Sequence, residues 1–197
     1  MRWLVEHHAS DIDPEWVWDE GSGGLKGVFG EKPMFPVVVA EKQVYRLRLT
    51  AAGEPGHGSM PYPDSANHKL IRALNRIVGD QRPMRVGKAA AAMFRALADT
   101  QGFPASFFLR HLSRRWVLAL AGPRLARDKF TNAVLRDTVS VNVIKAGYQI
   151  NVIPGQAVAE IDARLLPETD ADEFHRWLDR RVVSDDVRIE VVKSLPT

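Results

Sequence analysis

One glycine-rich loop, GEPGHGSMP over residues 53–61, places glycines on both sides of His57. Glycine tolerates backbone conformations that other residues avoid, so a ligand can approach such a loop closely. A neutral imidazole there can donate a hydrogen bond to a carbonyl oxygen or to a developing oxyanion. The alternative is a turn histidine that bonds only its own loop, and the local sequence favours this alternative. Ser59 could act as a nucleophile only with a base and an orienting acid, so we interpret it as a cap or turn hydroxyl.

Two further polar residues, Asn151 and Arg164, fall in segments that we expect to be strands. An asparagine is unfavourable in a strand unless it bonds something specific, so Asn151 either binds a ligand or pairs with water or a turn at an edge. Arg164 projects from the polar face of the next expected strand, and its planar guanidinium suits a carboxylate. A salt bridge to Asp162 or Glu160 is the simpler interpretation of Arg164.

The remaining candidates are carboxylates and histidines near the N-terminus. Asp19 and Glu20 in WDEGSGG can bind Zn²⁺ or simply cap a turn. The adjacent pair His7 and His8 has no third ligand at an obvious spacing, and we assign it to solvated surface. The chain contains no cysteine, which excludes a disulfide scaffold, a thiolate metal site and a cysteine nucleophile.

The elements that must position these residues are strands and two amphipathic helices. Apolar and polar residues alternate over 43–51, 138–146, 157–165 and 187–192, and a further strand is expected at 147–154. One helix is expected over 65–78, where the apolar residues Leu70, Ile71, Leu74, Ile77 and Val78 recur at helical spacing, and another over 170–182. The order strand, helix, strand, strand, helix, strand predicts an α+β fold of the βαββαβ (ferredoxin-like) type, with one sheet covered by two helices.

A basic helical insertion, about residues 82–130, interrupts this pattern. It contains ten Lys or Arg and two Asp, a charge of +8, and because the whole chain carries +3 the remainder carries −5. Helices are expected over 86–99 and 106–122, with aromatic residues interleaved. Such a segment can cover an acyl tail, lie on an anionic membrane, bind nucleic acid, or be a solvated basic face. Nucleic-acid binding is disfavoured, because the expected strands lack the stacked aromatic residues of RNA-binding sheets.

The composition is that of a folded protein with a sizeable core. The chain has 197 residues, of which 45% are apolar and 26% charged, a balance that allows a sizeable core and excludes disorder. The longest uncharged apolar run, residues 116–123, is too short to cross a bilayer. The N-terminus does not resemble a signal peptide, so the expected location is cytoplasmic or unknown.

Taken in order, several of these motifs resemble a known family. WDEGSGG, the pair Glu41–Lys42, GEPGHGSMP, NVIPG and DARLLPETD are similar to the M20 family of di-zinc metallopeptidases and aminoacylases. The phrase KFTNAVLRDTVSVNVIKAGYQINVIP at 129–154 resembles the branch of carboxypeptidase S and N-acyl-amino-acid hydrolases. The resemblance covers about residues 15–197, and its motifs are specific as an ordered set.

The resemblance implies how the chain is divided. Residues 1–38 would be the last part of the first segment of an α/β zinc-hydrolase catalytic domain, and residues 39–197 the lid or dimerization domain inserted in it. It implies a metal ligand at Glu20, or at Asp19, in a site that holds two zinc ions. It also implies a homodimer, no nucleic-acid partner and no transmembrane segment.

Roles for the other candidates follow from the same resemblance. It implies that His57 reaches the active site of the partner subunit and polarises the scissile carbonyl there. Asn151 and Arg164 match lid residues that bind the amide and the free carboxylate of a substrate. The implied substrates are peptides or N-acyl amino acids, cleaved at an amide bond next to a free carboxylate.

The rest of the family's metal site is missing from the sequence. The chain has no His-x-Asp motif and no Glu-Glu pair, the first member of which would be the general base. We therefore expect an internal piece of a hydrolase that is inactive alone and supplies substrate-clamping and dimer contacts. The alternatives are a non-catalytic dimerization or interaction module and a ferredoxin-like domain that binds nucleic acid.

Overall fold

The computed structural model describes residues 6–11, 37–183 and 186–195. The chain forms two compact units, Met1–Val38 and Val39–Thr197. Within the described part of the first unit, η1 (Ala9–Asp11) is a short 3-10 helix, and the Nδ1 of His8 lies 3.1 Å from the carboxylate of Asp11. His7 and His8 are both exposed, as expected.

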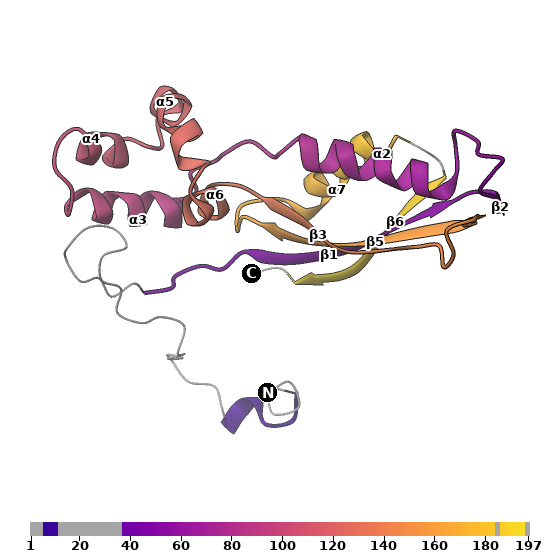
Figure 1. Cartoon of the computed structure of the whole chain (residues 1–197). Helices are drawn as coiled ribbons and strands as arrows, with labels where there is room; N and C mark the ends of the chain where they lie inside the picture. The colour runs from indigo at the N-terminus through magenta and orange to yellow at the C-terminus, as the bar shows by residue number, and fades with distance from the viewer. Residues whose placement is uncertain (1–5, 12–36, 184–185, 196–197) are drawn as a thin grey trace. The chain divides into compact units, whose positions relative to one another are not determined.

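A four-stranded antiparallel sheet organises the second unit. Its spatial order is β3-β5-β1-β6, formed by β1 (Gln43–Ala52), β3 (Thr138–Ala146), β5 (Gln156–Leu165) and β6 (Val187–Leu195). Two helices, α2 (Ala66–Gly79) and α7 (Ala171–Val182), lie along one face of this sheet (Figure 1). The expected α+β fold of the βαββαβ type is confirmed.

The core lies between the sheet and these two helices. Alternate residues of β1 and β5 are buried in it, namely Tyr45, Leu47, Leu49, Ala51, Ala157, Ala159, Ile161 and Ala163. The period of two expected for these strands is therefore confirmed. Not all the apolar residues of α2 are buried, because Ile71 and Val78 are 61% and 56% exposed. The buried arc of α2 is narrower than its apolar face, and these two side chains lie outside it.

Side-chain caps set where three helices begin. The hydroxyl of Ser65 accepts the amide of His68 at 3.4 Å at the start of α2. The carboxylate of Asp170 accepts the amide of Asp172 at 2.7 Å at the start of α7. The carboxylate of Asp128 likewise accepts an amide 2.9 Å away in the first turn of α6 (Lys129–Leu135). Each cap satisfies an amide that the first turn of a helix leaves unpaired.

The helical insertion differs from the expectation in two places. Besides α6, which carries the insertion past residue 130 to Leu135, it contains α3 (Lys88–Ala98), α4 (Ala105–Arg110) and α5 (Arg115–Leu125), and all four helices gather at one end of the sheet (Figure 1). The single helix expected over 106–122 was wrong, because the chain turns between α4 and α5, where the amide of Arg114 bonds the carbonyl of His111 at 2.9 Å. The second difference is α6, which begins at the Asp128 cap and was not expected from the sequence.

A buried ionic cluster joins the two ends of the insertion. Arg82, which precedes the insertion helices, donates to Asp137 at 3.1 Å and to Glu173 of α7 at 2.8 Å. Asp137, which follows them, is 3% exposed and also accepts from the amide of Leu166 and the hydroxyl of Thr169, both at 2.8 Å. The hydrogen bond from Arg82 holds the pKa of Glu173 below its usual value. The insertion is thereby tied to α7 and to the segment that joins β5 to α7.

Candidate functional site

The loops of His57 and Asn151 come together at one end of the molecule. A two-residue strand β2 (Gly56–His57) pairs with β4 (Val152–Ile153), so that His57 lies opposite Val152. The amide of Gly58 donates to the carbonyl of Asn151 at 2.8 Å. Two motifs separated by almost a hundred residues in the sequence are therefore hydrogen-bonded neighbours.

The strand expected over 147–154 is wrong for most of its length. Residues 148–151 form a turn, and only Val152 and Ile153 are in extended pairing. Gly147, at a φ of +68°, begins this turn in the left-handed region that favours glycine. Asn151 therefore lies in a turn beside His57. It does not need the specific bonding partner that an asparagine in a strand would need.

Close approach of backbones explains two of the glycines around His57. A Cβ on Gly58 would lie 3.2 Å from the backbone of Asn151. A Cβ on Gly53 would lie 2.5 Å from the amide nitrogen of Ala66, at the start of α2. Any larger residue at either position would push the His57 loop away from its neighbours.

The ring of His57 bonds its own loop through one nitrogen. Its Nδ1 accepts the amide of Ser59 at 3.2 Å and lies 2.7 Å from the hydroxyl of that residue. Because Nδ1 is an acceptor, the neutral ring carries its proton on Nε2. His57 is exposed, so this Nε2–H is the donor that it can offer to a ligand. The structure thus shows the bond of His57 to its own loop, the role of Nε2 toward a ligand stays a prediction, and Ser59 is the turn hydroxyl that was expected.

Arg164 lies near the opposite end of β5. That strand begins at Gln156, next to the Asn151 turn, and eight residues of extended chain separate Gln156 from Arg164 by roughly 26 Å. Its Nε donates to Asp162 at 3.0 Å, the ion pair that the simpler interpretation proposed. The side chain is 41% exposed. Among the described residues, its two Nη nitrogens have no hydrogen-bond partner.

Lys42, the second residue of the Glu41–Lys42 pair, is a further cation close enough to Arg164 to feel its charge. Its Nζ donates to the carbonyls of Ala133 and Arg136 at 3.0 and 2.9 Å, and to the hydroxyl of Thr138 at 3.0 Å. Burial lowers the pKa of Lys42 from 10.5 to about 8, the carboxylate of Asp137 opposes that shift, and Arg164 adds to it. Lys42 thus binds the last turn of α6, and no sequence pattern indicated that partner.

The expected metal ligands cannot be placed. Asp19 and Glu20 lie outside the described residues. Within residues 6–11, 37–183 and 186–195, no three His, Asp or Glu side chains gather in a way that could hold a metal ion. The donors in these described ranges therefore do not fit a zinc site.

The fold and the loops define a class of protein. The chain has an antiparallel βαββαβ sheet with a helical insertion, and one end of the sheet carries the His57 loop paired with the Asn151 turn. Residues 39–188 match the model of the peptidase dimerisation domain, M20_dimer, and the chain belongs to this family.

Comparison with individual proteins gives the same family. N-fatty-acyl-amino acid synthase/hydrolase PM20D1 of Mus musculus is 31% identical over 190 residues, which cover 94% of this chain and 37% of that protein. Probable carboxypeptidase S-like 2 of Dictyostelium discoideum is 28% identical over 193 residues, covering 95% of this chain and 36% of that protein. The chain therefore spans little more than a third of the relatives that it matches.

A solved structure was also matched. The crystal structure of human carnosine dipeptidase 1 aligns with a TM-score of 0.49 at 10% identity, covering 79% of this chain and 37% of the other. Separately, no helix among the described residues is both long and apolar enough to cross a membrane.

Proposed function

We propose that this chain is the lid and dimerisation part of an M20-type hydrolase that cleaves an amide bond next to a free carboxylate. The observation that carries the proposal is the pairing of β2 with β4, which joins the His57 loop to the Asn151 turn. The side chains supply an imidazole donor for a carbonyl oxygen, an amide for an amide, and a guanidinium for a carboxylate. The names of the relatives support an N-acyl amino acid as substrate, and a peptide is the alternative.

The geometry supports a site built from two chains. His57 and Arg164 are at opposite ends of β5, roughly 26 Å apart along the strand. One small substrate cannot touch both residues of the same chain. In a homodimer, the His57 and Asn151 end of one chain would complete the site that contains Arg164 of the other. Closure of the lid over the substrate would then exclude water from the reacting carbonyl.

The surface of the sheet supports a homodimer. β3 is an edge strand, and its residue Ile144 is 62% exposed. On α2, which contacts β3, the apolar residues Ile71 and Val78 are also exposed. An edge strand beside exposed apolar side chains is a surface that a second copy of the chain can cover by strand pairing and helix packing.

The metal in this proposal lies outside the described residues. We propose that the intact hydrolase holds two zinc ions, that Glu20 or Asp19 is one ligand, and that the other ligands come from residues absent from this sequence. Zinc would supply the activated water. The 197-residue chain alone is therefore proposed to be inactive, and zinc-dependent hydrolysis of N-lauroylglycine by the pure chain would contradict this.

Complementation between variants tests the two-chain site. In a longer protein that contains this domain, His57→Ala and Arg164→Ala are each expected to abolish most activity. Each mixed dimer would contain one site with both native residues, so random mixing should restore about a quarter of the native activity. A mixture as inactive as its two components, although mixed dimers form, would show that both residues act within one chain. The control pair is His57→Ala with Asn151→Ala, which lie in the same loop cluster and should not complement.

A further inference from the structure

Helix α5 of the insertion exposes an apolar stripe. Trp116, Ala119, Leu120 and Pro123 are all exposed and recur at the spacing that places them on one face of a helix. Trp116 is 50% and Leu120 67% exposed. The opposite side of α5 is buried at Val117 and Gly122. The helix is thus apolar on both faces, and the described residues of the chain cover only one of them.

Positive charge surrounds this stripe. Between residues 100 and 127 the chain has five Arg and no Asp or Glu. Four of these arginines are exposed and flank α5 at both ends: Arg114, Arg115, Arg124 and Arg127. None of the four forms an ion pair with a residue that the structure describes. An exposed apolar centre between guanidinium groups that have no ion-pair partner is complementary to a surface whose anionic outer layer covers an apolar interior.

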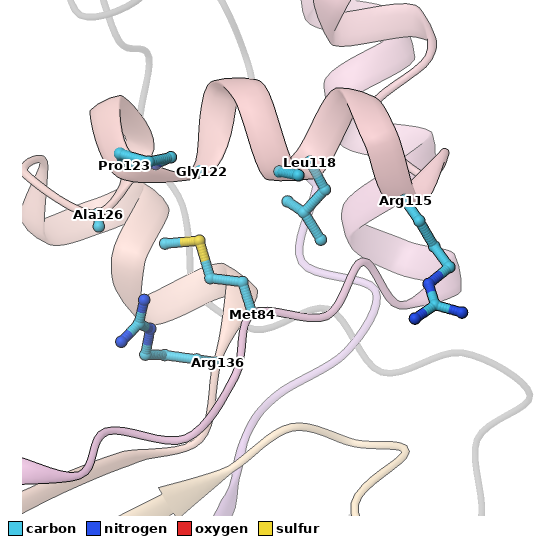
Figure 2. Close-up of a pocket in the computed structure, with 8 residues that line it drawn as sticks. Met84, Arg115, Leu118, Gly122, Pro123, Ala126 and Arg136 are labelled. Atoms are coloured by element: carbon cyan, nitrogen blue, oxygen red, sulfur yellow. The ribbon is translucent and has the colours of Figure 1, made fainter.

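A groove runs beside the stripe and shares Ala119 and Pro123 with it. It has a volume of about 490 Å³ and is lined by Met84, Arg115, Leu118, Ala119, Gly122, Pro123, Ala126 and Arg136. Figure 2 shows the side chains of Met84 and Leu118 in its middle, with Arg115 on one side and Arg136 on the other. Its walls are apolar and its ends are cationic, which suits an acyl chain below an anionic headgroup.

We propose that this face of the insertion, comprising the α5 stripe and the adjoining groove, docks on an anionic phospholipid bilayer. A second copy of the chain is a poor occupant, because the same arginines would face one another across a self-complementary contact. Nucleic acid would meet the arginines but would leave the apolar centre of the stripe against phosphates. A bilayer suits both the apolar stripe and the arginines. Leu120 and Pro123 would enter the boundary between headgroups and acyl chains, while the arginines would contact lipid phosphates. Trp116, whose ring centroid lies 6.4 Å from that of Phe107, would lie at the boundary between membrane and water. This inference is independent of the proposed hydrolase activity.

Vesicle sedimentation with the full 197-residue chain tests the inference. We expect binding to vesicles with about 30% phosphatidylserine and little binding to pure phosphatidylcholine. Trp116→Ala with Leu120→Gln should weaken binding by roughly tenfold or more, because the apolar stripe is lost. Arg124→Gln with Arg127→Gln should weaken it by roughly 30-fold, because each basic residue near an anionic surface contributes about fivefold.

A matched control removes the same charge elsewhere. Arg76→Gln with Arg180→Gln changes two exposed arginines on α2 and α7, and it should leave vesicle binding unchanged. Circular dichroism melting of every variant shows that the fold is kept, since all the substituted side chains are exposed.

Several results would overturn the proposal. One is binding to neutral vesicles that equals binding to anionic vesicles, and another is a loss in the control arginine variant that equals the loss in Arg124→Gln with Arg127→Gln. A third is binding that is unchanged by Trp116→Ala with Leu120→Gln, and a fourth is binding to DNA or an acidic protein but not to vesicles. Saturable binding of monomeric laurate without vesicle binding would also overturn it, because the groove would then serve a single soluble amphiphile.

Discussion

The buried pair Arg82–Asp137 offers the sharpest test of what holds the insertion to the sheet. In Asp137→Asn, one oxygen still accepts from Leu166 and Thr169, which lie at 2.8 Å in the native chain. The other oxygen becomes an amide nitrogen that faces the Nε of Arg82, a donor 3.1 Å away. Two donors then face each other, and the guanidinium of Arg82, 6% exposed, loses its buried counter-charge.

The magnitude follows from burial. Removing one partner of a buried ion pair costs about 3–5 kcal/mol because a charge remains uncompensated. Arg82 keeps its second hydrogen bond, to Glu173 at 2.8 Å, so the loss should lie at the lower end of that range, about 3 kcal/mol. For a domain of this size such a loss lowers the melting temperature by roughly 6–12 °C.

Urea unfolding followed by circular dichroism measures the change in the free energy of unfolding. The matched control is Asp162→Asn, whose partners Arg46 and Arg164 are about half exposed, so that loss should stay below about 1 kcal/mol. Adding Arg82→Met to Asp137→Asn should recover part of the stability, because the unpaired charge is removed. The reasoning is refuted if Asp137→Asn costs no more than Asp162→Asn.

Three further predictions concern single residues. Val183, at a φ of +41° after α7, should be replaceable by glycine with a gain of about 1 kcal/mol in thermal or urea unfolding; a loss would show that its side chain matters more than its backbone. Because folding lowers the pKa of Lys42 from 10.5 to about 8, the unfolded state binds more protons between these values and stability should rise with pH there. Lys42→Met should lack that rise in urea titrations at pH 8 and 10, and an unchanged slope would contradict the assignment. Gly58→Ala should speed amide hydrogen exchange in residues 147–153, because its Cβ would press on the backbone of Asn151 at 3.2 Å. Gly79→Ala, with no atom within 4 Å, is the control that should not.

Much of the fold could be predicted because local patterns and burial agree. The alternation along β1 and β5 matches the face that is buried, since side chains of a strand point alternately to its two sides. The apolar pattern is a weaker guide to burial on α2, where Ile71 and Val78 are apolar but exposed. An apolar residue at a helical spacing does not reveal whether its partner lies in the same chain.

Within the insertion, composition indicated helix but not its interruptions. The run 106–122 has helix-forming residues throughout, yet the chain turns at His111–Arg114. The start of α6 was visible in principle, because Asp128 precedes it at a capping position. The charge excess of the insertion was plain from the sequence, whereas the apolar stripe on α5 appeared only when the buried face of that helix was known.

The sequence by itself determined the α+β order of elements, the family resemblance, and the identity of His57, Asn151 and Arg164 as candidates. Residue type and short-range spacing contain that information, because capping, alternation and glycine loops are local properties. Only the tertiary structure decided which candidates are neighbours. Strand pairing over long sequence separations placed His57 beside Asn151. The length of β5 separated both from Arg164, and a pattern of residues along a chain does not contain such distances.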